Sequence, residues 1–455
     1  MSVPANPPSF PRGMALLVAG ALFMEILDAT ILAPAIPLIA SSFGVEAVDV
    51  NLAISAYLVA VAVLIPATGW LADRFGVRRV FLAAIVVFTL ASVGCAVSTS
   101  LPMLVAMRVV QGVGGAMMVP VGRLAVLRNS AKSDLVRAIA LLTWPALAAP
   151  VVAPVLGGAI ATVGSWRWIF LINIPLGVIG FLLALKLVRG GPVPSARTLD
   201  WAGMLLVGSG IAAGLIALES IRVSGTDWLL VGACGTAAIV LLASALWHLL
   251  RTPAPLIHLS VLRVRTLRIT VAAGSLYRMV ITAVPFLLPL MFVLEFGWTP
   301  LQAGLVVAAL FIGNLTIKPV TTPLMRRFGI RTVLIANGVA SVGCFGALAL
   351  VEPGVPVAVI AAVLYLSGAL RSIGFTAYNS LAFADVDGDE LTHANTLNAS
   401  VQELAAGLGI AFAALLVSLL ASYPVTFLVL GGALAVTLIE SVRLPRGAGR
   451  HVTGG

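Results

Sequence analysis

Long apolar runs recur along the whole chain, and each is long enough to cross a lipid bilayer as a helix. The hydrocarbon core of a bilayer is roughly 30 Å thick and takes about 20 residues of helix. The pattern predicts an all-α integral membrane protein with fourteen transmembrane helices. Their approximate bounds are 14–36, 52–72, 79–98, 101–121, 138–162, 167–187, 200–219, 228–250, 269–293, 301–318, 332–351, 355–378, 397–421 and 423–442.

A transmembrane β-barrel does not fit this pattern. Barrel strands alternate apolar and polar residues over about ten positions, whereas FLAAIVVFTLASVGCAV at 81–97 is apolar on every side. The composition agrees with helices in lipid, since 60% of residues are hydrophobic, 10% are charged and the mean hydropathy is +1.12. In lipid, a helix satisfies all backbone hydrogen bonds within its own segment.

Lys and Arg gather in alternate connections between the apolar runs. Examples are the clusters after the second and tenth runs, Arg74, Arg78 and Arg79, and Arg326, Arg327 and Arg331. The positive-inside rule then predicts cytoplasmic termini in a multi-pass protein of the plasma membrane. This rule also accounts for the net charge of +10, so nucleic acid is not an expected partner.

Two segments of the sequence repeat in the same orientation. DRFGVRRV at 73–80 returns as RRFGIRTV at 326–333, an offset of 253 residues (326 − 73). SVGC at 92–95 returns at 341–344 with an offset of 249 (341 − 92), which predicts a second copy shorter by one helical turn. Parallel repeats predict a six-helix half at 1–190, two inserted helices within 191–262 and a second six-helix half at 263–455.

Six segments, in order, resemble the fourteen-span drug:proton antiporter group of the major facilitator superfamily. The likeness covers nearly the whole chain, with departures at Ala33, Pro34 and Ala153. The segments are LDATILAPAIP (27–37), GWLADRFGVRRV (69–80), MRVVQGVGGA (107–116), APVLGGAI (153–160), WRWIFLINIP (166–175) and TLDWAGMLL (198–206).

The resemblance implies a multidrug efflux permease rather than an enzyme. Such a protein is a proton-coupled secondary transporter that exports small amphipathic or cationic compounds by alternating access. Its expected partners are the small-molecule substrate, protons and the lipid bilayer, with an accessory envelope protein as a further candidate, and it is expected to function as a monomer. A carrier of one specific metabolite and, less readily, a membrane-embedded enzyme are the alternatives.

No cofactor or metal is expected from the sequence. Cys95, Cys234 and Cys344 lie singly in apolar runs, and the four histidines are dispersed. A membrane enzyme would need clustered ligands or a nucleophile with its base inside the spans. No G-x-x-x-x-G-K-S/T loop occurs, so ATP is not the expected energy source.

Charges inside the predicted spans are the main functional candidates, because an ionised group near the bilayer centre costs about 2.5–3.5 kcal/mol on insertion scales. Glu25 and Asp28 lie three residues apart in the first run, on one expected helix face, and Arg108 lies in the fourth. We expect these three to couple proton movement to transport. The alternative is a permanent structural ion pair between Asp28 and Arg108.

A substrate pocket is expected between the two halves. Its candidate residues come from both halves and are polar or charged: Glu403, Arg278, Arg371, Gln111, Asn314 and Tyr277. Helix–helix hydrogen bonding is the alternative role for the uncharged ones, and pairing with Arg371 or Arg278 is the alternative for Glu403.

Two further segments suggest moving parts. The first is a cytoplasmic latch that stabilises one access state, in which glycines permit close helix approach and a tight turn; its residues are Gly69, Asp73, Arg74, Gly76, Arg78 and Arg79. The second is a kinked antiporter helix, which combines helix-bending prolines with a glycine pair: Pro150, Pro154, Gly157 and Gly158. Topogenic charge and generic packing are the respective alternatives.

Overall fold

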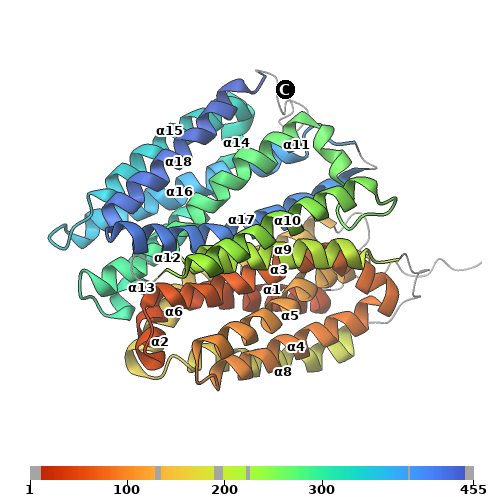
Figure 1. Cartoon of the computed structure of the whole chain (residues 1–455), viewed down its shortest axis with the longest axis horizontal. Helices are drawn as coiled ribbons and strands as arrows, with labels where there is room; N and C mark the ends of the chain where they lie inside the picture. Colours follow the sequence, from red (N-terminus) through yellow and green to blue (C-terminus); the bar gives the residue numbers. More distant parts are fainter. Residues whose placement is uncertain (1–11, 129–134, 189–197, 222–225, 388–389, 446–455) are drawn as a thin grey trace, which may run out of the picture.

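The computed structural model describes residues 12–128, 135–188, 198–221, 226–387 and 390–445, and every regular element in them is helical (Figure 1). The α-helices are α1 (Arg12–Ile31), α2 (Ile36–Phe43), α3 (Asn51–Phe75), α4 (Val77–Ala96), α5 (Leu101–Arg128), α6 (Leu135–Val163), α7 (Trp168–Leu171), α8 (Asn173–Leu187), α9 (Trp201–Glu219), α10 (Trp228–Arg251), α11 (Arg265–Ile269), α12 (Ser275–Leu294), α13 (Pro300–Thr316), α14 (Lys318–Phe328), α15 (Ile330–Ala349), α16 (Val357–Ala382), α17 (Leu391–Leu420) and α18 (Tyr423–Arg443). The expected all-α membrane architecture is confirmed.

The described helices match the fourteen predicted crossings only in part. Within the described residues, twelve helices are long and apolar enough to cross a membrane, and the pair α13 and α14, bent by 48°, would make a thirteenth. Helix α6 has 29 residues, but its apolar stretch, Ala148–Val163, is too short to be counted among the twelve. Fourteen crossings therefore remain a prediction.

The helices form two bundles with two peripheral helices between them. In Figure 1 the red and orange helices α1, α3, α4 and α5 lie together, and the blue and cyan helices α15, α16 and α18 form a second group. Helix α6 packs against α1 and α13, and α3 packs against α5 and α17, so α6 and α3 join the bundles. Helices α9 and α10 pack on each other, and α9 touches α3 and α17 from outside. Most of the surface of both helices is exposed.

The sequence repeat is also a structural repeat. Gly76 and Gly329 both adopt positive φ, 84° and 77°, in the turns before α4 and α15. Two residues later in each copy, Arg78 Nη2 donates to the Leu185 carbonyl at 2.9 Å and Arg331 Nη2 donates to the Val442 carbonyl at 2.8 Å. Each arginine thus ties the start of one helix to the end of the last helix of its bundle.

The expected shortening of the second copy is wrong. Helices α4 and α15 both have 20 residues, and both ends keep the offset of 253. The SVGC segments therefore lie one helical turn apart in depth within equivalent helices. A match of four small residues repeats easily in apolar helices, whereas the glycine turn with its arginine is fixed by geometry.

A carboxylate outside the spans holds the two peripheral helices to the chain that follows them. Asp200 caps α9 by accepting from Gly203 N at 2.8 Å, and it also bonds His248 Nε2 of α10 at 2.7 Å and Leu256 N at 3.0 Å. Partial burial opposes ionisation of Asp200, but these hydrogen bonds outweigh it and lower its pKa below the ordinary value.

The substitution Asp200→Ala is expected to lower the free energy of unfolding by about 0.5–2 kcal/mol at neutral pH, because the cap and both ties are lost. A carboxyl with a lowered folded pKa stabilises above its unfolded pKa of about 4 and loses that contribution as pH falls through the folded value. The difference in melting temperature from wild type should therefore shrink below about pH 4. Asp227→Ala, which removes only the cap of α10, is the matched control; an equal effect of both would contradict the role of His248.

Candidate functional site

A cavity of about 920 Å³ lies between the two bundles. Its walls come from α1, α3, α5 and α6 on one side and from α12, α13, α16 and α17 on the other, with a contribution from the start of α14. Most of the lining is apolar, including Phe286, Phe311 and Phe375. The charged side chains that line it are two acids and four bases: Glu25, Glu403, Arg123, Arg278, Lys318 and Arg371.

Close helix packing shuts the cavity at one end. A Cβ on Gly158 of α6 would meet the Pro300 carbonyl oxygen, and one on Gly304 of α13 would meet the Pro154 carbonyl oxygen. Leu301 N also donates to Thr162 Oγ1 at 3.1 Å across the same contact. At this end the two bundles touch backbone to backbone.

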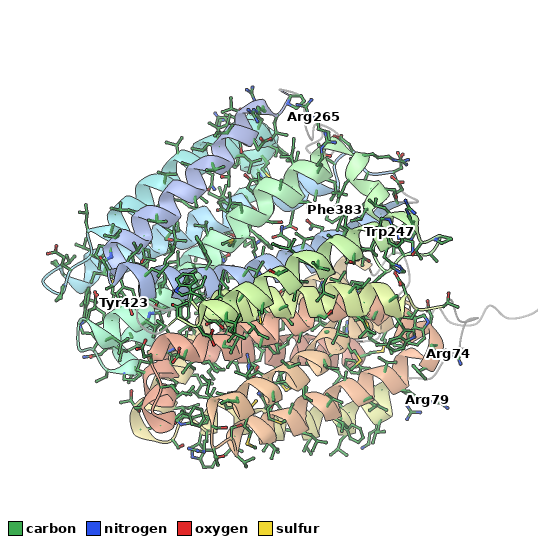
Figure 2. The ribbon with its side chains drawn as sticks, in the orientation of Figure 1. Arg74, Arg79, Trp247, Arg265, Phe383 and Tyr423 are labelled. Atoms are coloured by element: carbon green, nitrogen blue, oxygen red, sulfur yellow. The ribbon has the colours of Figure 1, made fainter. Side chains whose placement is uncertain are left out.

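The other end of the cavity lies toward the basic end of the molecule. Lining residues there include Phe383, which Figure 2 places on the same side of the molecule as Arg74 and Arg79, away from Tyr423. Arg123 of α5 and Lys318 of α14 also line this part. The cavity therefore extends from the closed contact toward the end that carries the clustered arginines.

Glu25 of α1 faces this cavity. It interacts electrostatically with Glu403 on the opposite bundle and with Arg123 on α5. Its neighbour Tyr57 is 1% exposed, lines the same wall and has a hydroxyl without a hydrogen-bond partner among the described residues. A Cβ on Gly115 would lie 3.5 Å from Glu25 Oε1 and 2.9 Å from the Tyr57 hydroxyl, so both oxygens gather at this glycine.

Asp28, in contrast, is sealed inside the first bundle. Its side chain is 0% exposed and pairs with the equally buried Arg108. Gln111 Nε2 and Asn173 Nδ2 donate to Asp28 Oδ1 at 2.9 and 2.7 Å, and Ser92 Oγ accepts from Gln111 at 2.8 Å. This buried network joins α1, α4, α5 and α8.

Arg108 holds the network together from α5. Its Nη1 also donates to Gln111 Oε1 at 2.8 Å and its Nε to the Ala53 carbonyl at 3.3 Å. The guanidinium lies over the Tyr57 ring, with its carbon 4.3 Å from the ring centroid. Tyr57 thus separates the buried ion pair from the cavity that holds Glu25.

The expectation that Glu25 and Asp28 share one face needs correction. Residues three apart on a helix differ by about 60° in direction, and here that angle turns Glu25 to the cavity and Asp28 into the bundle. The structure therefore separates one cavity acid from one buried acid.

Four of the six expected pocket residues line the cavity: Glu403, Arg278, Arg371 and Asn314. Arg278 Nη2 lies 3.9 Å from Glu403 Oε1, and Arg371 Nη1 donates to the Ile281 carbonyl at 3.2 Å. Gln111 lies instead in the buried network. Tyr277 lies outside this lining, where its hydroxyl donates to the Leu370 carbonyl at 3.0 Å and accepts from Asn337 Nδ2 at 3.3 Å.

Several polar residues of the site were not expected from the sequence. Arg123 follows the run predicted at 101–121, and Lys318 ends the run predicted at 301–318. Neither was among the expected pocket residues, but both line the cavity. Arg123 continues the four-residue spacing of Gly115 and Val119, which also line it, and this spacing was the available signal. Asn173 lies within the WRWIFLINIP segment, and a lone asparagine among apolar residues was the signal that could have identified it.

The two expected moving segments have different surroundings. Pro150 and Pro154 of α6 line the cavity, and Gly157 and Gly158 make backbone-close contacts with Ile31 and Pro300. In the other segment Gly76 makes the expected turn, and Arg74 and Arg79 lie at the end of the molecule (Figure 2). Asp73 lies in the last turn of α3. The close helix approach expected at Gly69 is wrong for this conformation, since a Cβ there would meet nothing within 4 Å.

Gly158→Ala is expected to weaken the closed contact by about 1–3 kcal/mol, because the atoms that a Cβ would meet belong to the Pro300 and Leu301 backbone and cannot rotate away. Spin labels on exposed Val163 and Leu305, in a background without the native cysteines, should report a longer distance between α6 and α13. Gly180→Ala, with nothing within 4 Å, is the control. An unchanged label distance in Gly158→Ala would show that the contact tolerates a methyl group.

Comparisons with known proteins agree with this architecture. The family model described as Major Facilitator Superfamily matches residues 18–409 and, in a second match, 270–451. A Klebsiella pneumoniae (strain 342) protein named "Putative multidrug resistance protein MdtD" is 36% identical over 420 residues, covering 90% of this chain and 87% of that protein. A Haemophilus influenzae protein named "Probable transport protein HsrA" is 36% identical over 408 residues, covering 90% and 88%.

Solved structures share the fold at low sequence identity. The nucleoside transporter NupG has a TM-score of 0.68 at 14% identity, covering 94% of this chain and 99% of its own. A D-xylose–proton symporter has a TM-score of 0.68 at 15% identity, covering 97% and 99%. The family match, the relatives and the fold agree: the chain belongs to the major facilitator superfamily of membrane transporters.

Proposed function

We propose that this protein exports small amphipathic compounds, cationic ones among them, in exchange for protons. The observation that carries the proposal is a cavity between two bundles, closed at one end, in which Glu25 and Glu403 interact across the space. Relatives named for multidrug resistance and for transport support the direction and the breadth of cargo. A carboxylate that binds either a proton or a cationic cargo exchanges one for the other.

The proposed orientation places the basic end of the molecule in the cytoplasm of a plasma-membrane protein, with both termini on that side and fourteen crossings. Figure 2 has Arg74, Arg79 and Arg265 at the end opposite Tyr423, which suits the positive-inside rule. The cavity then faces the cytoplasm, where cargo is collected. The contact of Gly158 and Gly304 is the outer gate of this conformation.

We assign proton coupling to Glu25, Asp28 and Arg108 with distinct parts. Glu25 contacts the cavity and takes the proton or the cargo directly. Asp28 is held by Arg108, Gln111 and Asn173 and has no exposed surface in this conformation. A shift of α1 against α5 would loosen that pair and admit water, so Asp28 would be accessible only in the other access state.

Alternating access would rock the half at 1–190 against the half at 263–455, with 191–262 as the peripheral insert. The kinked helix α6 lies at their boundary, and its glycines meet α13 without intervening side chains. The segment from Gly69 to Arg79 would stabilise one state as a cytoplasmic latch. The unit would be a monomer, and an accessory envelope protein would act only after release from the outer gate.

The proposal is tested with purified protein in liposomes and an imposed pH gradient. Ethidium accumulation that follows the gradient, and that collapses when a protonophore removes it, is the expected result. Proton release on adding ethidium to unbuffered, detergent-purified protein would identify the coupling ion independently. Accumulation that is insensitive to the protonophore, or no accumulation with any of a panel of amphipathic cations, would overturn the proposal.

A further inference from the structure

The charged groups in the cavity form two adjoining pairs of opposite sign. Glu25 of α1 and Glu403 of α17 both line the cavity, one from each bundle. Arg278 of α12 and Arg371 of α16 line the cavity from the same bundle as Glu403. Arg278 Nη2 lies 3.9 Å from Glu403 Oε1, so the two pairs adjoin at this contact. The cavity therefore presents a negative region beside a positive one.

The positive region contains more charge than its neighbours balance. Among the described residues no carboxylate lies within 4 Å of Arg371, whose hydrogen bond in the structure is to the Ile281 carbonyl. Lys318 is a further cation of the cavity lining, and its Nζ donates to Thr376 Oγ1 of α16. Partly buried like charges repel one another, and an anion between them removes that cost.

Neutral polar residues of α13 and α16 line the same cavity. Asn314 of α13 lines the cavity. Its backbone lies close to α16, since a Cβ on Gly368 would be 3.0 Å from Asn314 N. Ser372 follows Arg371 in sequence, lines the cavity, and is 1% exposed with its hydroxyl unpartnered in the described structure. A cargo anion could accept hydrogen bonds from the Arg371 guanidinium, which offers a bidentate contact. The Asn314 amide and the Ser372 hydroxyl are further donors in the same cavity.

We propose that the cavity binds zwitterionic amphipathic compounds, with the cationic group of the cargo at Glu25 and Glu403 and its anionic group at Arg371. The inference rests on the proposed export function and narrows its cargo class. The cationic group competes with the proton at the acids, which preserves exchange. The anionic group takes no part in that competition, and it balances the charge of Arg371.

The test uses three forms of one fluorescent quinolone. Norfloxacin carries a piperazinium and a carboxylate, its ethyl ester keeps only the cation, and its N-acetyl derivative keeps only the anion. Binding to the full-length protein in detergent is measured by fluorescence anisotropy against empty micelles. Wild type is expected to bind norfloxacin roughly tenfold or more tightly than either derivative, as the loss of one charged hydrogen bond implies.

Variants separate the two ends of the site. Arg371→Gln should reduce norfloxacin affinity to that of the ester and leave the ester unchanged, whereas Arg371→Lys should restore part of the preference. Glu403→Gln should weaken norfloxacin and the ester alike. Arg443→Gln, which removes an exposed cation paired with Glu440, is the control and should leave all three affinities unchanged.

The outcomes distinguish this inference from the export function. Equal affinity of wild type for norfloxacin and its ester, or no binding of norfloxacin, overturns the zwitterion site while proton-driven ethidium transport stands. A preference that survives in Arg371→Gln also overturns it, because the anion then binds elsewhere. Loss of proton-driven transport for every cargo would instead refute the export function.

Discussion

Glu25→Gln is expected to abolish proton release on cargo binding and proton-driven accumulation in liposomes, while the protein stays folded. Glu25 is an acid of the first bundle that lines the cavity, and glutamine keeps its shape but not its titration. Affinity for a cationic cargo should fall roughly tenfold or more, since a charged contact is lost. Proton release in unbuffered detergent solution and ethidium flux under an imposed pH gradient are the measurements.

Controls make this result specific to the cavity. Glu440→Gln removes a carboxylate that is paired with Arg443 at the surface and should leave both measurements at wild-type levels. Melting temperature and elution volume should be unchanged in Glu25→Gln, because Glu25 faces open space rather than packed side chains. Wild-type proton release from the variant would move the coupling site to Glu403 or Asp28.

The fold could be predicted from the sequence because lipid leaves a chain few choices. Apolar runs that must satisfy their own backbone hydrogen bonds become helices, and the runs at 79–98 and 332–351 coincide within a few residues with α4 and α15. The repeated turn was also predictable, since a glycine at positive φ between two spans is required by geometry. The depth of the SVGC segments was not, because small residues fit at many depths.

The candidate site could be predicted only in part, for two physical reasons. Hydropathy does not distinguish cavity water from bulk water. Arg123, beyond the run predicted at 101–121, and Lys318, at the end of the run predicted at 301–318, were therefore not expected in the pocket, although both line the cavity. A 48° bend separates α13 from α14. Helix α14 begins at Lys318 and continues to Phe328, beyond the run predicted to end at 318. Helix rotation is the second reason: Glu25 and Asp28 differ by about 60°, and only packing decides which one faces water.

Asp28 accepts three hydrogen bonds, from Arg108, Gln111 and Asn173, and its pair with Arg108 is therefore the most sensitive point of the first bundle. Both side chains are 0% exposed, so removing one charge leaves the other buried and uncompensated. We expect Asp28→Asn and Arg108→Gln each to lower the free energy of unfolding by about 3–5 kcal/mol. Melting curves of the detergent-purified protein, followed by intrinsic tryptophan fluorescence, measure this loss.

The double variant Asp28→Asn with Arg108→Gln separates structure from coupling. With both charges gone, no charge is left unpaired, and the two amides can still bond to Gln111 and Asn173. The double variant should therefore lose less unfolding free energy than the sum of the two single losses. Proton-driven transport should stay absent, because the pair can no longer change its protonation between access states. A double variant whose loss equals the sum of the two single losses would show that the two charges do not stabilise each other. Wild-type transport by it would make the pair a structural tie and leave Glu25 as the coupling acid of α1.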